Sequence, residues 1–168
     1  MKLLLTLLTL LISRRGIALI NLIIVAFIAL ISFELYELMA DAASNADEIE
    51  EILDTVGVIL IAWGVALEER GTLMESFGAY AGGCPAAEEH ADHASHVYGL
   101  AALLLGLFME VAVELVKIPD HVVNTFGIEH ILFWIGIFFM VVSAGLLLNM
   151  NLDLLRSGRT CGKAGHPA

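Results

Sequence analysis

The apolar residues of this 168-residue chain are gathered into four long blocks, and this grouping limits its possible folds more than any other feature. An α-helix needs about 20 mostly apolar residues to cross the roughly 30 Å hydrocarbon layer of a bilayer. The blocks cover residues 17–36, 52–67, 97–116 and 128–150. The second block is short, but its helix can extend through polar residues at both ends. Because strand-like alternation is absent, the blocks predict membrane helices rather than a membrane β-barrel.

The composition agrees with this interpretation. Hydrophobic residues make up 59% of the chain and charged residues 16%, and the mean hydropathy is +0.87. Soluble domains carry about 25% charged residues. We therefore expect an all-α integral membrane protein, with a four-helix transmembrane bundle over residues 17–155 and a cytoplasmic tail over residues 156–168.

The first 16 residues form a separate apolar segment, which begins MKLLLTLLTLLI. It resembles the apolar region of a signal peptide, but SRRG follows it instead of a small-residue cleavage site. Ten apolar residues in a helix cover only about 15 Å, which is too short to span a bilayer. We expect a retained, short interfacial helix. The alternative is an atypical signal peptide that is removed.

Basic residues predict the orientation of the bundle. With four crossings, seven of the eight lysine and arginine residues fall on one side, and only Lys117 falls on the other. Basic residues favour the cytoplasmic side, so both termini are predicted to be cytoplasmic, in a bacterial inner membrane. The outer side then carries twelve acidic residues against one lysine, so the net charge of −11 is concentrated there.

Particular residues also predict helix ends and helix contacts. Ser44 and Asp47 fit a capping box that begins the second helix, and Pro119 ends the third.

Asn21 and Asn149 are isolated polar residues within apolar blocks, where an interhelical hydrogen bond is the expected role. Small residues inside the blocks predict closely packed helices; they are Gly57, Ala62, Gly64, Ala102, Gly106 and residues 143–145.

The strongest functional pattern is a group of acidic residues at the outer ends of the helices. Glu110 and Glu114 share one face of the third helix, while Glu34 and Glu37 occupy the matching depth on the first. Acidic groups at membrane depth normally face a partner, a water-filled cavity or the bundle interior. An acidic mouth of this kind attracts cations and suits proton or cation binding. The alternative is that these helices end earlier and the acids are solvated. The full candidate set is Glu34, Glu37, Asp54, Glu110, Glu114, Glu129 and His130.

A second candidate site is a histidine-rich stretch before the third block. Glu89, His93 and His96 share one helical face, His90 lies beside it, and Cys84 can complete a ligand set. Two imidazoles and a carboxylate suit a divalent metal ion such as zinc, iron or nickel. The simpler interpretation, which we favour, is that the third helix continues out of the membrane as a polar turn.

No complete catalytic set occurs in the sequence. It lacks the Glu-x-x-His pairs of di-metal bundles, and no serine, histidine and acid share one depth in the predicted spans. We therefore predict a non-enzymatic protein without a resident cofactor. Its predicted partners are the lipid bilayer and other membrane subunits or copies of itself, and not nucleic acid. The alternatives are a cation or proton pathway and cytoplasmic metal binding.

Overall fold

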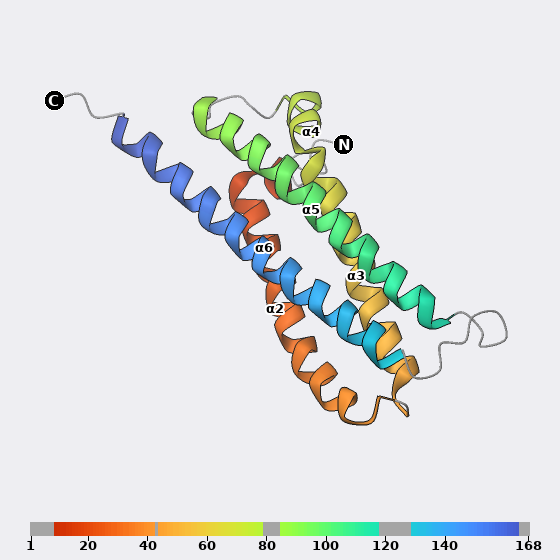
Figure 1. Cartoon of the computed structure of the whole chain (residues 1–168). Coiled ribbons are helices and arrows are strands. Elements are labelled where there is room, and N and C mark those ends of the chain that lie inside the picture. The colour runs from red at the N-terminus through yellow and green to blue at the C-terminus, as the bar shows by residue number, and fades with distance from the viewer. Residues whose placement is uncertain (1–8, 43, 79–84, 118–128, 165–168) are drawn as a thin grey trace.

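The computed structural model describes residues 9–42, 44–78, 85–117 and 129–164, with side chains except at 85–87, 129 and 157–164. Regular structure in these ranges is entirely helical, which confirms the all-α prediction (Figure 1). The elements in chain order are α2 Arg14–Leu38, the 3-10 helix η1 Met39–Asp41, α3 Ala46–Glu68, α4 Arg70–Ser76, α5 Pro85–Lys117 and α6 Glu129–Ala164.

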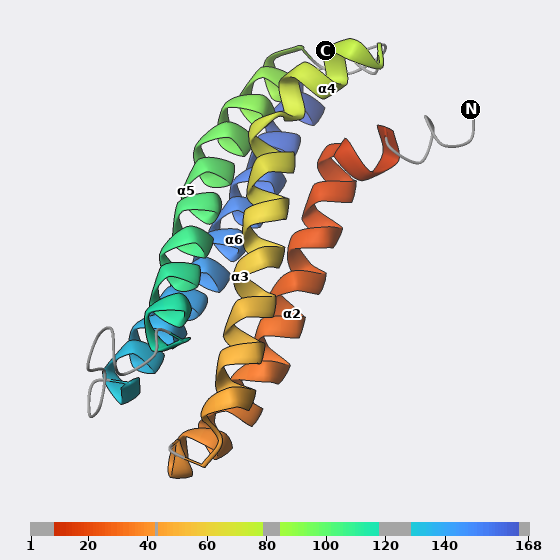
Figure 2. The same ribbon diagram turned by 90° about the vertical axis from the view of Figure 1, so that its right-hand side faces the viewer.

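Four long helices lie side by side, and each runs antiparallel to the one before it (Figures 1 and 2). The start of α2, the short helix α4 and the end of α6 therefore lie at one end of the bundle, which we call the α4 end. The opposite end, which holds η1, is the η1 end. Helix α3 packs mainly against α5, α5 also packs against α6, and α2 packs mainly against α6.

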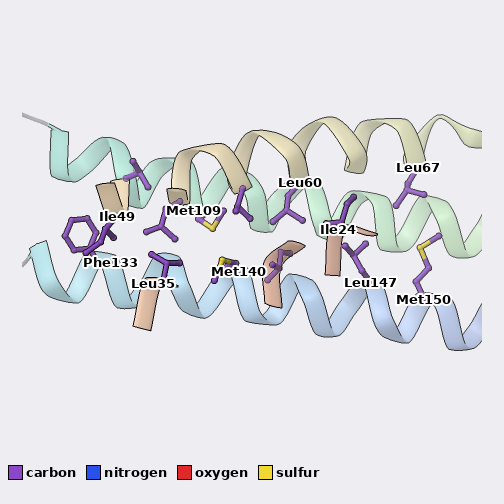
Figure 3. Packing of buried hydrophobic residues seen from close by; sticks show 14 of the residues in the cluster. Ile24, Leu35, Ile49, Leu60, Leu67, Met109, Phe133, Met140, Leu147 and Met150 are labelled. Atoms are coloured by element: carbon purple, nitrogen blue, oxygen red, sulfur yellow. The ribbon is translucent and has the colours of Figure 1, made fainter. Parts of the chain in front are cut away.

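The core is a continuous column of large apolar side chains between these helices (Figure 3). Ile49 and Phe133 fill it near the η1 end, and Leu147 and Met150 fill it toward the α4 end. These side chains are no more than 1% exposed. Helix α3 contributes to this column along its whole length, so it is as much a part of the bundle as the other long helices.

Within the described residues, three helical stretches are long and apolar enough to cross a membrane: 14–41, 88–117 and 130–156. They contain the first and third predicted spans and residues 130–150 of the fourth, and they are typical of a membrane-embedded protein. The second predicted span lies in α3, which does not meet this criterion. Acidic residues near both ends of α3, Glu51 and Asp54 at one and Glu68 at the other, shorten its uncharged stretch.

Glycines bring the backbones of α3 and α5 into direct contact, as the small residues predicted. Gly64 faces Gly99, and a Cβ atom added at Gly64 would lie 2.6 Å from the Leu103 nitrogen and 2.8 Å from the Gly99 oxygen. One helical heptad away, a Cβ atom at Gly106 would lie 3.0 Å from the Gly57 oxygen. Gly99 belongs to this interface although the sequence did not single it out. Ala62 and Gly145 do not belong to it, because both are exposed.

Two helix starts show how local polar groups set the boundaries. The Ser13 hydroxyl accepts a hydrogen bond from the Gly16 nitrogen at 3.1 Å, so Ser13 caps α2. This cap separates the short helical stretch 9–12 from α2. The predicted capping box of α3 is wrong, because Asn45 is the cap residue and makes no side-chain capping bond. The Ser44 hydroxyl instead donates to the Asp41 carbonyl oxygen at 3.2 Å and closes the preceding turn.

Asn21 is fully buried at the meeting point of three helices. Its amide nitrogen donates to Asn151 Oδ1 of α6 at 3.0 Å, and its amide oxygen accepts from Trp63 Nε1 of α3 at 2.6 Å. The predicted interhelical role of Asn21 is thus confirmed. Asn149 also bonds between helices, because it donates to the Tyr98 hydroxyl of α5 at 3.0 Å. Buried polar groups need such partners, so this network helps to fix the relative positions of α2, α3 and α6.

Candidate functional site

The candidate site with the most unusual environment lies between α3 and α5 near the η1 end. Glu110 of α5 packs against Gly57 of α3, where the missing side chain leaves room for its carboxyl group. A Cβ atom at Gly57 would lie 2.5 Å from Glu110 Oε1. The charged groups around Glu110 are Asp54 of α3 and Glu114 and Lys117 of α5. We call these four residues the Glu110 cluster.

Glu110 Oε1 is fully buried and receives no hydrogen bond from a donor among the described residues, while the Asp54 carboxyl group lies beside the Glu110 carboxyl group. Burying a polar group without a partner costs free energy, and the cost is larger when the group is ionised. A proton or a cation at this oxygen would reduce that cost. The cluster therefore has the chemistry of a cation-accepting or proton-accepting site, with three carboxyl groups and one ammonium group.

Lys117 joins the other members of the cluster at its exposed side. Its Nζ lies 3.1 Å from Glu114 Oε1 and 3.4 Å from Asp54 Oδ1. The Glu114 side chain is 63% exposed, so this pair contributes little to stability. Lys117 covers the side of the cluster that faces outward and compensates part of its negative charge. In the sequence Lys117 is notable only as the exception to the orientation rule, and its contacts with Glu114 and Asp54 were not predicted.

The other members of the predicted acidic mouth lie elsewhere. Glu34 and Glu37 are exposed on α2, which packs mainly against α6 and makes little contact with α5. His130 is exposed and accepts a hydrogen bond from Trp134 Nε1 at 3.1 Å, one turn along α6. The side chain of Glu129 lies outside the described residues. Among the predicted residues whose side chains are described, the structure brings together only Asp54, Glu110 and Glu114.

The predicted metal ligands lie on the first turns of α5, which extends beyond the apolar block as we expected. Glu89, His90, His93 and His96 are all exposed. Where side chains are described, no group of three or more histidine, cysteine or acidic residues is arranged to hold a metal ion. Cys84 lies outside the described residues, so the complete predicted ligand set is not tested.

A second polar cluster, at the α4 end, was not predicted as a site. Arg70 begins α4 and is fully buried. Its guanidinium group pairs with Glu88 at 2.7 Å and with Asp92, both on α5, and its Nε donates to the Ile12 carbonyl oxygen at 3.1 Å. Arg14 of α2 pairs with the other oxygen of Glu88 at 3.1 Å. These ion pairs hold α4, α5 and the start of α2 together.

An apolar layer separates the polar groups near the two ends of the bundle. From Asp54 to Trp63 along α3 the distance is about 13 Å. The core at this level contains Leu60, Met109 and Met140, each fully buried. The buried Ser143 hydroxyl nearby donates to the Phe139 carbonyl oxygen of its own helix at 2.8 Å. No described polar side chain therefore links the Glu110 cluster to the Asn21 network through this layer.

The chain was compared with models of protein families, with curated proteins and with solved structures. No family model matches it, and no curated protein or solved structure shows significant similarity.

Proposed function

We propose that the protein is a non-enzymatic integral membrane protein with four transmembrane helices that serves as a subunit of a larger membrane complex. Helix α3 supplies the fourth crossing in this proposal. Its 23 residues extend about 35 Å, and it shares the core of the three apolar helices. The α4 end, which holds Arg14, Arg15, Arg70 and Arg156, is assigned to the cytoplasmic side of a bacterial inner membrane. Residues 1–16 then lie at the cytoplasmic membrane surface.

The observation that supports a partner is the outer face of α3, which differs from the outer faces of the other helices. Thr55, Val58, Ala62 and Val65 form a narrow exposed stripe along it. The outer face of α2 instead carries large side chains such as Leu30 and Phe33, which are 74% and 70% exposed. Large apolar side chains suit contact with lipid tails, whereas small ones allow another helix to approach closely. We therefore assign the α3 stripe to a partner transmembrane helix.

Charge favours a different protein over a second copy as this partner. Exposed Glu51 and Glu69 lie at the two ends of the same stripe. A symmetric pair of copies would place like charges opposite each other at both ends, which is unfavourable. The outer sides of two copies, each rich in acidic residues, would also repel. The expected partner is an apolar helix with basic residues at its ends.

Ala62→Phe is expected to reduce co-purification of the partner complex by about tenfold, because overpacking a helix contact costs about 1–3 kcal/mol. The measurement is the mass of the tagged protein extracted from its native membrane in mild detergent, with quantification of the bound subunits. Ala26→Phe is the matched control, since Ala26 is an exposed alanine on the lipid-suited face of α2. It should leave the complex intact.

The partner assignment fails if the wild-type protein is strictly monomeric with no bound subunit, or if both variants behave alike. A homodimer that Ala62→Phe dissociates would keep the α3 interface but would reject the charge argument. Protein identification in the purified complex distinguishes these results.

The buried oxygen of Glu110 supports a second candidate function, the uptake of a cation or proton. Glu110→Gln is expected to lower cation or proton flux into proteoliposomes by about tenfold, the effect of losing a charged interaction of roughly 1.5 kcal/mol. Glu37→Gln is the matched control, because it removes an exposed carboxylate on α2 near the same end of the bundle that lies outside the Glu110 cluster. Equal flux in the wild type and Glu110→Gln would remove this function. Cation or proton uptake is the weaker of the two candidate functions, because an apolar layer lies below the Glu110 cluster.

A further inference from the structure

Two pockets meet at the bend that precedes α2. The larger pocket, about 550 Å³, is lined by Leu10 and Leu11 on one side of the bend and by Leu19 and Ile20 on the other. The smaller pocket, about 240 Å³, is lined by Ala18 of α2 and by Leu154 and Leu155 of α6. Arg14 and Arg15 line both pockets. A pair of arginines therefore lies at the α4 end between the larger hollow, which is mainly apolar but also lined by Glu88, and the smaller hollow, whose lining is about half polar.

The two arginines have different electrostatic surroundings. Arg14 pairs with Glu88, which also pairs with the buried Arg70, and Arg70 in turn pairs with Asp92. In this set two guanidinium groups face two carboxylates, so their charges cancel. Arg15 is exposed and makes no ion pair among the residues that the structure describes. The positive charge at the mouth of both pockets is therefore that of Arg15.

We infer that Arg15 binds the phosphate of an anionic phospholipid whose acyl chains lie along the leucines of the two pockets. Guanidinium groups recognise phosphate oxygens through paired hydrogen bonds. Basic pockets on the cytoplasmic side of membrane helices suit anionic headgroups, since this leaflet is negatively charged. The apolar walls identify a lipid rather than free phosphate, because only hydrocarbon gains from contact with Leu10, Leu19 and Leu155. The site depends on the proposed orientation of the bundle but not on its partner or on Glu110.

The test is native mass spectrometry of the full chain in micelles that contain equal amounts of phosphatidylglycerol and phosphatidylcholine. The wild type is expected to retain phosphatidylglycerol preferentially, and Arg15→Gln should lower this retention about fivefold, as expected for one basic residue at a membrane surface. Arg156→Gln is the matched control, because Arg156 is an exposed arginine at the same end that lines neither pocket. It should retain phosphatidylglycerol like the wild type. Far-ultraviolet circular dichroism checks that both variants are folded.

Three results would overturn the inference. Equal retention of phosphatidylglycerol by the wild type and Arg15→Gln would show that Arg15 does not bind it. The same loss in Arg156→Gln would indicate diffuse attraction to the basic end instead of a site. Full displacement of the lipid by millimolar inorganic phosphate would identify an anion site in which the apolar walls have no role.

Discussion

Arg70→Met is expected to lower the free energy of unfolding by about 3–5 kcal/mol, the cost of removing one partner from a buried ion pair. The guanidinium group of Arg70 is fully buried and faces Glu88 and Asp92. Its loss would leave the Asp92 carboxylate without this cation and Glu88 with Arg14 alone. Denaturant unfolding in detergent micelles, followed by circular dichroism, measures the effect. The Ile12 carbonyl oxygen also loses its donor, so the bend before α2 should become more accessible to protease.

A combined variant separates the charge effect from the loss of packing. Arg70→Met with Glu88→Gln and Asp92→Asn removes the buried guanidinium group together with the charges of its two partly exposed partners, and it should recover most of the lost stability. Arg156→Met, on the exposed surface of α6, should change stability by less than about 0.5 kcal/mol. If Arg70→Met alone is as stable as the wild type, the ion pairs do not hold α4 in place.

The number and approximate limits of the helices were predictable because apolar blocks of this length have few other structural solutions. The blocks at 17–36, 97–116 and 128–150 fall within α2, α5 and α6, apart from residue 128, which lies outside the described ranges. Both α5 and α6 extend well beyond their blocks, and the extension of α5 is rich in alanine and glutamate, which favour helix. The predictions for Asn21 and for the small residues succeeded for a related reason. A polar or small residue inside an apolar block has few possible roles other than helix contact.

The lateral arrangement of the helices was not predictable from the pattern. Depth along a helix follows from counting residues, so Glu34 and Glu110 were reasonably placed near the same end. Which helices are neighbours depends on how whole surfaces fit together. Since α2 packs mainly against α6, Glu34 and Glu37 lie apart from the Glu110 cluster. An acidic mouth shared by α2 and α5 was therefore the part of the prediction with the least physical basis.

The burial of Arg70, at the other end of the bundle, was not predictable either, because it too depends on which helices are neighbours. In the sequence it is one of eight basic residues, next to Glu68 and Glu69, and nothing marks it as buried. Its burial arises because α4 follows α3 after a single turn residue and places Arg70 against Glu88 and Asp92 of α5. The spacing of these two acids by four residues, on one helical face, was the only local signal.

Gly64→Ala is expected to destabilise the bundle by about 1–3 kcal/mol, although alanine is the better helix former. The added Cβ atom would lie 2.6 Å from the Leu103 nitrogen and 2.8 Å from the Gly99 oxygen, which are backbone atoms that cannot turn aside. Helices α3 and α5 must then move apart, and the buried Leu60 and Leu67 beside this contact lose packing. Denaturant unfolding in detergent micelles measures the change.

Gly145→Ala is the matched control for the glycine contact, because a Cβ atom there meets no atom within 4 Å. It should leave stability unchanged or raise it by up to about 1 kcal/mol, the helix propensity difference between alanine and glycine. The two variants make the same chemical change in two long helices. Changes in stability of opposite sign would therefore identify the close approach of α3 and α5 as the cause. Equal effects would mean that the two backbones can separate at no cost. In that case the glycines would not be what brings α3, the long helix with the shortest uncharged stretch, into the bundle.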